Sequence, residues 1–523
     1  MIHAWSVEQV RAAEAAAMEQ VGDEELMDRA SRALADVVAA RLEEERDERS
    51  DGQPGEASRA PRVVALVGRG NNGGDALWAL AHLAELWDGD LQLTVVQVAD
   101  VAHPAGLEAA RQAGATVLVA SSHGEEGEES DQGGDSAAAP AEQALADADL
   151  VLDGIAGLGS RPGLDPATVD LVDAIGPQAY VVAVDLPSGA DPSGETIPDS
   201  QVYADETVTF IAPKPVHVLA GAASCGLLTV VDIGVELDPD EQPVAQSLEF
   251  DDVPHLWPMP GPEDDKYTRG VLGVVAGGQT YTGAAVLSTL SAVESGVGMV
   301  RYVGPDHAAD QVRGFVPEAV YGTGRVQAHV VGPGLDVDDD SEPGRAQVQA
   351  ARDALDSAEP CVVDAGALSL LDGPRSQAGA RTLLTPHAGE LATLLARLDG
   401  EVTIEEVKAR PVQSARRAAE LLHATVLLKG ATTYVVPPPR SGLPVRAQSD
   451  APAWLGTAGS GDVLAGLCGA LLAAGLDPLD AGSLAALVHG VAGHDANPHG
   501  PVRATRVAQQ IPRTVAHLLT RRP

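Results

Sequence analysis

The chain has few cysteines, few aromatic residues and no long apolar run. Its three cysteines, Cys225, Cys361 and Cys468, are too few and too far apart for a disulfide framework or a zinc cluster, which fits a reducing compartment. Aromatic residues make up 3% of the chain, so Val, Leu and Ala must form most of any core. No apolar stretch approaches the roughly 20 residues that a membrane-spanning helix needs, and the first residues lack the basic and apolar regions of a signal peptide. We therefore expect a cytoplasmic protein without a membrane partner.

Positive charge is also scarce. The formal net charge at pH 7 is −42, and the acidic residues are spread through segments that look folded. This excess argues against nucleic acids and anionic membranes as partners, because both would be repelled. Lysine occurs at four positions, which are Lys214, Lys266, Lys408 and Lys429. The composition resembles that of halophiles that accumulate salt, which screens such repulsion, and we expect a lysine that is kept in such a chain to have a specific role.

At 523 residues, the chain is long enough for two or three domains with sizeable cores. Its first half predicts a helix over residues 6–46, a loop or linker over 47–61 and a surface insertion over the polar residues 121–140. Short apolar runs predict buried strands. These runs cover residues 62–67, 91–98, 115–119, 150–153 and 180–185. Strands that alternate with helical stretches predict a parallel sheet with right-handed crossovers.

The same alternation begins again in the second half. Residues 236–262 are rich in proline and aspartate and are expected to link two domains, which would cover residues 1–235 and 263–523. A helix is predicted over residues 284–294, and strands are predicted over 271–276, 328–331, 361–363, 381–384 and 425–428. Each strand meets a glycine, aspartate or proline at its C-terminal end, where open α/β sheets place their ligands. We therefore expect two α/β domains, each with its loops gathered on one face.

A glycine-rich loop, residues 68–75, lies between the first predicted strand and the next helix. Its glycines permit tight turns, so the loop could present backbone N–H groups to a phosphate and asparagine oxygens to a cation. Its spacing is neither that of a Walker loop nor that of the dinucleotide fingerprint, so the loop alone is weak evidence. Asp153 and Asp185 follow two other predicted strands, and each could be a site carboxylate or a turn cap.

Together these three loops resemble the epimerase domain of the NAD(P)H-hydrate repair enzymes. The similarity covers about residues 1–235 and includes the segments 26–30, 214–215 and 231–234. It implies a Rossmann-like three-layer α/β/α sandwich with Asp185 as the acid/base. The chain departs from the family pattern at Ala76, where glycine is usual, and in the loop 157–161, which is one residue short. The implied potassium ligands are Asn72, Asp153 and Ser188, and the implied substrate-binding residues are Asn71, Asn72, Gly73, Gly74, Asp75, Gly157, Leu158, Gly159, Ser160, Arg161, Pro162 and Asp185.

The segment from Ala458 to Asp462, ahead of an apolar run, predicts a loop that opens a helix. Backbone N–H groups at such a helix start form an anion site, and glycine allows close approach. Asp462 could take a proton from a hydroxyl there while the N–H groups hold the developing charge, or it could simply stabilise the helix start. Lys429, after a buried-looking strand, could neutralise a phosphate. His387 taken alone would be assigned to the surface or to packing.

With the segments 277–284, 331–335 and 384–390, these residues resemble the ribokinase-like superfamily, and within it the ADP-dependent NAD(P)H-hydrate dehydratases. The similarity covers about residues 246–523, and it departs from the family pattern at residues 451–455. It implies a ribokinase-like α/β/α domain with Asp462 as the catalytic base. The implied nucleotide-binding residues are Lys429, Gly430, Ala431, Thr432, Thr433, Gly459, Ser460 and Gly461, and those implied to contact the hydrated nicotinamide nucleotide are Ala284, Gly334, His387 and Asp462.

Both resemblances imply one repair pathway, with an epimerase fused to a dehydratase. The implied substrates are hydrated NADH and NADPH with ADP, the implied ions are Mg²⁺ and K⁺, and we expect a homo-oligomer. Two alternatives stay open on the sequence. The C-terminal domain could be a kinase for a sugar or a hydroxymethylpyrimidine, which would leave a stable phosphorylated product. The N-terminal domain could be a nucleotide-binding or scaffolding module without catalysis.

Overall fold

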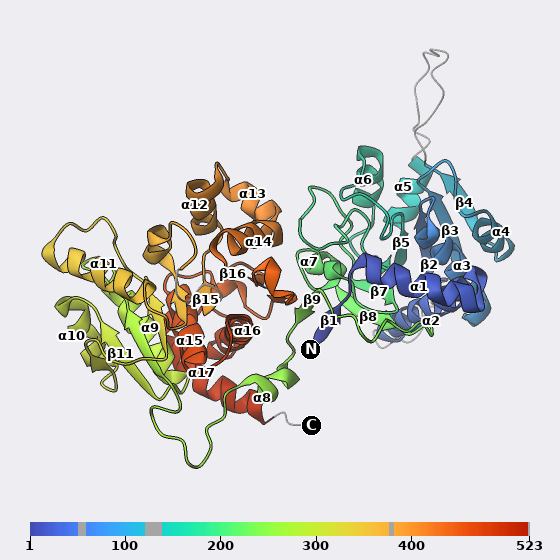
Figure 1. Ribbon diagram of the computed structural model, residues 1–523. Helices are drawn as coiled ribbons and strands as arrows, with labels where there is room; N and C mark the ends of the chain where they lie inside the picture. The colour runs from blue at the N-terminus through green and yellow to red at the C-terminus, as the bar shows by residue number, and fades with distance from the viewer. Residues whose placement is uncertain (51–58, 121–138, 376–380, 521–523) are drawn as a thin grey trace. The chain divides into compact units, whose positions relative to one another are not determined.

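The computed structural model describes residues 1–50, 59–120, 139–375 and 381–520 (Figure 1). The chain forms two compact units. The N-terminal unit comprises His3–Pro243, and the C-terminal unit comprises Val244–Pro523 together with Met1–Ile2. Each unit is built around its own sheet. The surface insertion predicted over residues 121–140 lies almost wholly outside the described residues.

The N-terminal unit contains seven parallel strands in the order β4-β3-β2-β5-β6-β7-β8. From β2 the chain runs outward to β4, then returns to the other side of β2 with β5 and continues to β8. All side chains of β2 from Val63 to Val67 are buried, as its apolar run predicted for a strand covered on both faces. The strands are β2 (Arg62–Val67), β3 (Gln92–Gln97), β4 (Thr116–Val119), β5 (Leu150–Gly154), β6 (Tyr180–Val184), β7 (Glu206–Phe210) and β8 (Leu227–Val231).

Helices cover both faces of this sheet. On one face α2 and α3 pack against the strands, with Leu77 in contact with the cluster around Val63. On the other face α5 and α6 contribute Leu145 and Leu171 to a second cluster. The predicted three-layer α/β/α sandwich is therefore confirmed. The helices are α1 (Val7–Val21), α2 (Asp23–Ser50), α3 (Asn71–Leu86), α4 (Pro104–Gln112), α5 (Ala139–Ala146), α6 (Pro166–Asp173), the 3₁₀ turn η1 (Pro215–His217) and α7 (Ala222–Cys225).

The C-terminal unit contains an eleven-stranded mixed sheet in the order β1-β9-β18-β17-β16-β15-β14-β13-β10-β11-β12. Neighbouring strands from β16 to β12 are parallel, whereas β17 runs antiparallel to both of its neighbours, β16 and β18. The strands are β1 (Ile2–Ala4), β9 (Ala245–Ser247), β10 (Val271–Val275), β11 (Met299–Val303), β12 (Val320–Tyr321), β13 (Ala328–Val331), β14 (Cys361–Val363), β15 (Thr382–Leu384), β16 (Thr425–Leu428), β17 (Thr433–Val436) and β18 (Val445–Gln448).

Helices α9, α15, α16 and α17 cover the sheet face that carries Leu272, Val362 and Leu427. Helices α11 and α14 contact the strands as well, at β10 and β13 and at β16 and β17. The layers match the predicted ribokinase-like α/β/α domain. The helices are α8 (Val253–Leu256), α9 (Thr282–Glu294), α10 (Asp306–Phe315), α11 (Glu342–Leu355), α12 (Ala388–Asp399), α13 (Ile404–Ala409), α14 (Pro411–Leu422), α15 (Ser460–Ala473), α16 (Pro478–Ala496) and α17 (Ala504–Leu519), with 3₁₀ turns at η2 (Phe250–Asp252), η3 (Ala365–Leu370), η5 (Pro439–Ser441) and η6 (Ala453–Leu455).

The structure differs from the predicted element pattern in three places. Gly22, with φ of 90°, divides the predicted helix over 6–46 into α1 and α2. The predicted linker over 236–262 contains β9, η2 and α8, because Gln246 joins the sheet as the register partner of Arg446. The antiparallel strands β17 and β18 extend a sheet that was expected to be parallel.

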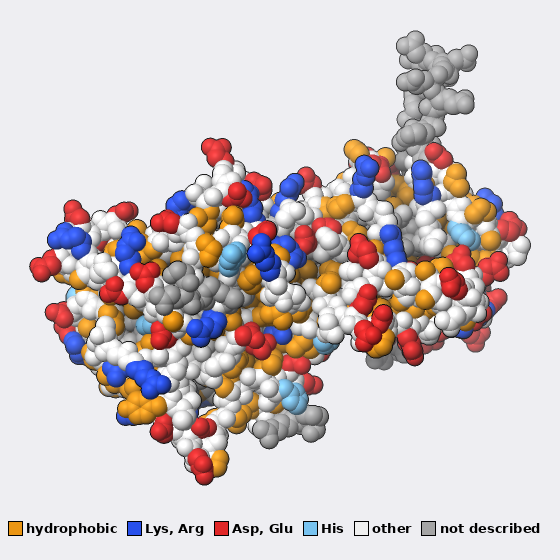
Figure 2. All heavy atoms as spheres, viewed as in Figure 1, with side chains coloured by type: hydrophobic (Ala, Val, Ile, Leu, Met, Phe, Trp, Pro, Cys, Tyr) orange, Lys and Arg blue, Asp and Glu red, His pale blue; other side chains and the backbone are white. Residues whose placement is uncertain are grey.

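The surface carries the acidic charge. Figure 2 shows Asp and Glu side chains over the visible face of both units. Among the described residues, no helix is long and apolar enough to cross a membrane.

Candidate functional site

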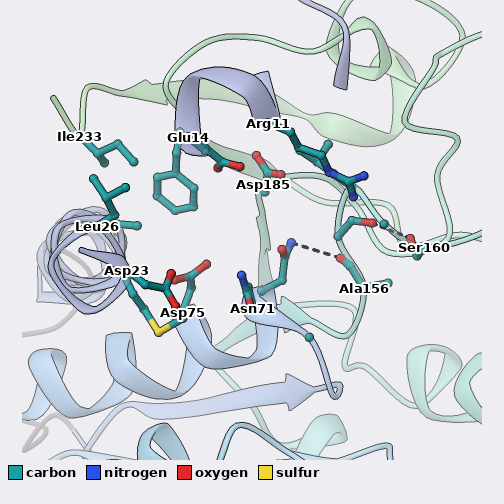
Figure 3. A pocket seen from close by; sticks show the side chains of 18 of the residues that line it. Arg11, Glu14, Asp23, Leu26, Asn71, Asp75, Ala156, Ser160, Asp185 and Ile233 are labelled. Carbon is teal, nitrogen blue, oxygen red and sulfur yellow. Dashed lines mark hydrogen bonds between the residues drawn. The ribbon is translucent and has the colours of Figure 1, made fainter. Parts of the chain in front are cut away.

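The N-terminal unit has a cavity of about 560 Å³ at the C-terminal ends of its strands (Figure 3). Its wall combines the start of α3, the loops after β5 and β6, and the helices α1 and α2. Figure 3 shows Glu14 beside Asp185 and Asp23 beside Asp75. The lining residues are Arg11, Glu14, Met18, Asp23, Leu26, Met27, Ala30, Arg69, Gly70, Asn71, Asn72, Asp75, Ile155, Ala156, Gly157, Leu158, Gly159, Ser160, Asp185, Phe210 and Ile233.

Asp185 is held firmly at the end of β6. Its backbone has a φ of 67°, in the left-handed region that Asp and Asn enter more readily than most residues. Its Oδ1 atom accepts hydrogen bonds from Lys214 Nζ at 2.5 Å and from Thr209 Oγ1 at 2.9 Å. His217 Nδ1 accepts the Lys214 backbone N–H, so a neutral His217 donates its Nε2–H to the Asp185 carbonyl at 2.8 Å. Strand β7 and the turn after it therefore fix the carboxylate.

The charge state of Asp185 follows from these contacts. Burial opposes ionisation, but the Lys214 ammonium and the hydrogen bonds from Lys214 and Thr209 hold the pKa of Asp185 below its usual range. The Lys214 side chain is almost fully buried, and its ammonium also donates to the Phe210 carbonyl. Burial and the nearby Lys214 charge lower the pKa of His217 to about 4, so it is neutral at pH 7. Asp185 is thus an ionised carboxylate facing a cavity.

Two further carboxyl groups in the cavity have a raised pKa, whereas that of Asp185 is lowered. Burial and the negative charges of Asp185, Glu14 and Asp23 raise the pKa of Asp75 to about 8. Burial, followed by the charge of Asp185, raises the pKa of Glu14 as well, against the opposing influence of Lys214 and Arg11. A carboxyl group that stays protonated at neutral pH can donate a proton, whereas Asp185 can accept one. The cavity therefore pairs an acid with a base.

The three residues implied as potassium ligands form one hydrogen-bonded group beneath the cavity. Ser188 donates its Oγ–H and its backbone N–H to the two oxygens of Asp153, at 2.5 and 2.7 Å. Ser188 Oγ accepts the Ala156 N–H, while the Asn72 amide donates to the carbonyls of Ala156 and Val184. Burial raises the pKa of Asp153 to about 6 against the effect of the Ser188 hydrogen bonds. Side-chain oxygens of Asp153 and Ser188 and the side-chain amide of Asn72 therefore gather around residue 156.

Not every residue implied for substrate binding lines the cavity. Gly73 and Gly74 are buried in the start of α3, where a Cβ at Gly73 would lie 2.4 Å from the Gly68 carbonyl oxygen. Arg161 and Pro162 lie outside the lining, and the short loop contributes residues 157–160 instead. Ala76 is buried against Gly154 and does not reach the cavity, so this departure from the family pattern leaves the cavity wall unchanged.

No sequence pattern predicted that α1 contributes to the wall of the cavity. Arg11 and Glu14 lie on an Ala-rich helix whose charges resemble those of any solvated helix face, so no local signal marked them. Lys214 was marked by the scarcity of lysine, but nothing in the sequence indicated that it pairs with Asp185 across 29 residues. The segments 26–30 and 231–234 meet through a hydrogen bond from Arg29 to the Ile233 carbonyl.

In the C-terminal unit, the predicted loop and helix start are present. Gly459 has φ of 91° and precedes α15, which begins at Ser460 and carries Asp462 in its first turn. A Cβ at Gly461 would lie 3.2 Å from Lys429 Nζ, and one at Gly459 would lie 2.5 Å from Leu287 of α9. The glycines therefore let Lys429 and α9 approach the backbone at this helix start.

Lys429 is paired with Asp364, a residue that the sequence pattern did not single out. Lys429 Nζ lies 2.8 Å from Asp364 Oδ1 and 3.8 Å from Glu390 Oε2. Thr385 Oγ1 donates to the same Asp364 oxygen at 2.9 Å. Burial acts to lower the pKa of Lys429, but Asp364, Glu390 and Asp462 outweigh it and raise that pKa. Lys429 is therefore a firmly held cation among carboxylates.

Asp462 stands in this same group of charges. Burial raises its pKa to about 7, and the negative charges of Asp364 and Glu390 add to the rise while Lys429 opposes it. A general base works best when its pKa lies near the working pH. Asp462 therefore has the affinity for a proton that a base at neutral pH requires.

The other implied residues of the C-terminal unit converge on these strand ends. Lys429 donates its backbone N–H to the Pro386 carbonyl, and His387 forms a parallel backbone bridge with Lys429. A Cβ at Gly334 would lie 2.8 Å from the Ala284 side chain, and one at Gly332 would meet the backbone of Asp364. Residues 430–432 form the turn between β16 and β17, and Thr433 begins β17. The Ser460 hydroxyl donates a hydrogen bond to the Leu455 carbonyl, in the loop before α15. Among the described residues, no group of three His, Cys, Asp or Glu side chains could hold a metal ion.

Comparison with known proteins adds independent findings. A family model described as NAD(P)H-hydrate dehydratase matches residues 272–513, and a model described as YjeF-related protein N-terminus matches residues 23–216. A protein of Mycobacterium tuberculosis named bifunctional NAD(P)H-hydrate repair enzyme Nnr is 41% identical over 485 residues, which cover 91% of this chain and 90% of the relative. Its namesake from Mycobacterium leprae is 39% identical over 498 residues, covering 94% and 93%. A Bacillus subtilis ADP/ATP-dependent NAD(P)H-hydrate dehydratase, co-crystallized with ATP/Mg²⁺, is 26% identical with a TM-score of 0.46, covering 52% of this chain and 98% of that one.

Proposed function

The chain belongs to the family of bifunctional NAD(P)H-hydrate repair enzymes, and we propose that Asp185 and Asp462 carry its two reactions. The protein repairs NADH and NADPH whose nicotinamide ring has taken up water. The N-terminal domain epimerises the C6 hydroxyl, and the C-terminal domain removes it in an ADP-dependent dehydration. The observation that carries the residue assignment is that each assigned carboxylate lies near a lysine at the C-terminal ends of the strands. Asp185 accepts a hydrogen bond from the buried Lys214, and Asp462 lies among the charges of Lys429, Asp364 and Glu390.

Epimerisation requires a proton to leave the C6 hydroxyl and to return after the carbon has changed face. The ionised Asp185 can take the hydroxyl proton as the bond between C6 and the ring nitrogen opens. The protonated Asp75 can supply the matching proton to the nitrogen, and both transfers reverse when the ring closes on the other face. Lys214 acts as a positioning residue, because it keeps Asp185 ionised and fixed. The opposite pKa shifts of Asp185 and Asp75 support this assignment.

Potassium would be held by Asn72, Asp153 and Ser188. Their oxygen atoms suit a hard cation, and the fully buried Asp153 carboxylate would gain a counter-ion. A bound potassium ion would supply positive charge and would fix the backbone of Ala156, which forms part of the cavity wall. The cation's effect on the cavity is therefore structural in this proposal.

Dehydration requires hydroxide to be turned into a better leaving group. Asp462 would deprotonate the C6 hydroxyl, whose oxygen attacks the terminal phosphorus of ADP and displaces AMP. The N–H groups of residues 459–461 and the Lys429 ammonium would carry the charge in transfer. Mg²⁺ bound to the phosphates of ADP would offset their charge. The ring nitrogen lone pair then expels phosphate, and loss of the C5 proton restores the double bond.

One assay tests the two proposed reactions and the role of potassium. An equimolar mixture of the two epimers of hydrated NADH is incubated with the protein, ADP and Mg²⁺, and the absorbance of reduced nicotinamide is followed. In potassium buffer we expect complete recovery. With potassium replaced by tetramethylammonium at equal ionic strength, recovery should stop near half, because only one epimer is dehydrated. Release of a stable phosphorylated nucleotide instead of inorganic phosphate would show that the protein is a kinase. Equal recovery in both buffers would show that epimerisation does not depend on potassium.

The raised pKa of Asp462 predicts the pH dependence of dehydration. A base must be ionised to act, so kcat/KM on the reactive epimer should fall as pH falls below about 7 and should lose roughly tenfold for each further unit. The D462N variant should show a low residual rate without this dependence, since the amide does not titrate in that range. A wild-type profile that stays flat between about pH 7 and pH 5 would contradict the role of Asp462 as base.

A further inference from the structure

The N-terminal unit has a second cavity, of about 300 Å³, at the ends of β3 and β4. Its volume lies at the lower end of the range for ligand pockets, about 300–1,000 Å³. It is formed by the loop after β2, the residues after β3, the end of β4 and the start of α6. The lining residues are Gly68, Arg69, Val98, Ala99, Asp100, Ala120, Ile155, Asp165, Ala167, Thr168 and Leu171.

The two cavities adjoin at the point where the strand order reverses, between β2 and β5, and they extend from it in different directions along the sheet. Both cavities take residues from the loops after β2 and β5. The first extends to the ends of β6 and β7, whereas the second extends to the ends of β3 and β4 and to the start of α6. Open α/β sheets with this strand order bind dinucleotides across that point, with one nucleoside on each side. The nicotinamide end belongs in the first cavity, beside Asp185. The adenosine end of the same molecule therefore has a place in the second.

Arg69 lies between the two cavities. It lines both of them, as does Ile155, and it directly precedes the start of α3 at Gly70 and Asn71. Its guanidinium makes no hydrogen bond or ion pair with the residues that the structure describes. A dinucleotide that occupied both cavities would carry its diphosphate past this residue and the N–H groups of the helix start, which favour an anion.

Two negative charges line the second cavity. Asp100 follows β3, at the strand end where dinucleotide-binding sheets place the carboxylate that binds the adenosine ribose. Its side chain is exposed and has no partner among the described residues. Asp165 caps α6 by accepting the Thr168 N–H and hydroxyl, and it keeps its charge. Such carboxylates accept hydrogen bonds from ribose hydroxyls and repel a 2′-phosphate.

We propose that this second cavity binds the adenosine half of the substrate, that Arg69 binds its diphosphate, and that Asp100 makes the epimerase favour hydrated NADH over hydrated NADPH. The inference rests on the proposed epimerase function and adds to it the binding site and the cofactor preference. It concerns the N-terminal domain alone. The preference is one of degree, because an exposed carboxylate repels a phosphate by a modest energy in water.

The test measures epimerisation by the full-length protein without ADP, which leaves dehydration idle, with the epimers separated by chromatography. Three substrates are compared: hydrated NADH, hydrated NADPH and the hydrated mononucleotide, which lacks the adenosine phosphate. For the wild type we expect kcat/KM to fall in that order. D100N should reduce the preference for hydrated NADH by up to about fivefold through KM. R69A should raise KM roughly tenfold for both dinucleotides and change the mononucleotide little.

The matched control is D90N, which removes an equally exposed carboxylate just before β3, at its other end, and should leave all three values unchanged. Ionic strength is held constant, because salt screens these charges. Equal efficiency on dinucleotide and mononucleotide would overturn the adenosine site. An unchanged preference in D100N would overturn the role of that residue. If the wild type epimerises none of the three substrates, the proposed function fails, and the inference fails with it.

Discussion

Replacing Asp462 with Asn is expected to leave only a low residual rate of dehydration while ADP binding persists. The amide keeps the size of the side chain and removes the proton acceptor, and a positioned base contributes about 10²- to 10⁴-fold. The contacts proposed for the nucleotide come from backbone N–H groups and Lys429, which the substitution leaves in place. The measurements are kcat with the reactive epimer of hydrated NADH and the dissociation constant of ADP by calorimetry.

A matched control separates catalysis from helix stabilisation. Asp306 occupies the first turn of α10 in the same unit, as Asp462 does in α15. D306N removes an exposed first-turn carboxylate whose interaction with the helix dipole is worth about 0.3–1 kcal/mol. It should therefore lose little thermal stability and should resemble the wild type in activity. Dehydration by D462N at more than about a tenth of the wild-type rate would end the assignment of Asp462 as the base.

Replacing Asp185 with Asn should stop epimerisation and leave dehydration intact. The substitution removes the carboxylate that we assign as the base, and a loss of about 10²- to 10⁴-fold in kcat is expected. Asn is the informative choice, because it tolerates the positive φ of this position, whereas Ala would add strain of order 1–3 kcal/mol. The measurement is the interconversion of the separated epimers without ADP.

The same preparation of D185N supplies its own control. Asp185 belongs to the N-terminal unit and Asp462 to the C-terminal unit, so the reactive epimer should be dehydrated at the wild-type rate. In an equimolar mixture with ADP, recovery of reduced nicotinamide should then stop at the reactive epimer. Clearance of both epimers by D185N at the rate of the wild type would refute the proposed role. A parallel loss of dehydration would instead indicate a wider structural defect.

The ends of the strands could be predicted from the sequence because a polar residue or glycine follows each apolar run. Apolar runs that end in Asp153 or Asp185 predicted β5 and β6 within one residue. Glycine before Asp462 predicted the start of α15, and the scarcity of lysine directed attention to Lys214 and Lys429. These features depend on residues that are adjacent in the chain, so the amino-acid sequence alone is enough to predict them.

Features that depend on distant residues could not be predicted in this way. Asp364 follows a recognisable strand, but its role arises from Lys429, 65 residues away. Glu14 enters the cavity only because α1 returns to the strand ends, and its charge pattern is that of a solvated helix. The pKa of Asp75 rises through burial and through carboxylates of three other segments. Pairing of this kind is a property of the packed fold.

The distribution of amines has a practical consequence for handling the protein. Lys214 is enclosed and Lys429 is tied to Asp364, while Lys266 and Lys408 stand exposed. The raised pKa of Lys429 further reduces the share of free, nucleophilic amine at that position. Among the lysines, succinimidyl dyes or aldehyde-coated beads should therefore react at Lys266 and Lys408 in preference to Lys214 and Lys429, which belong to the two proposed sites.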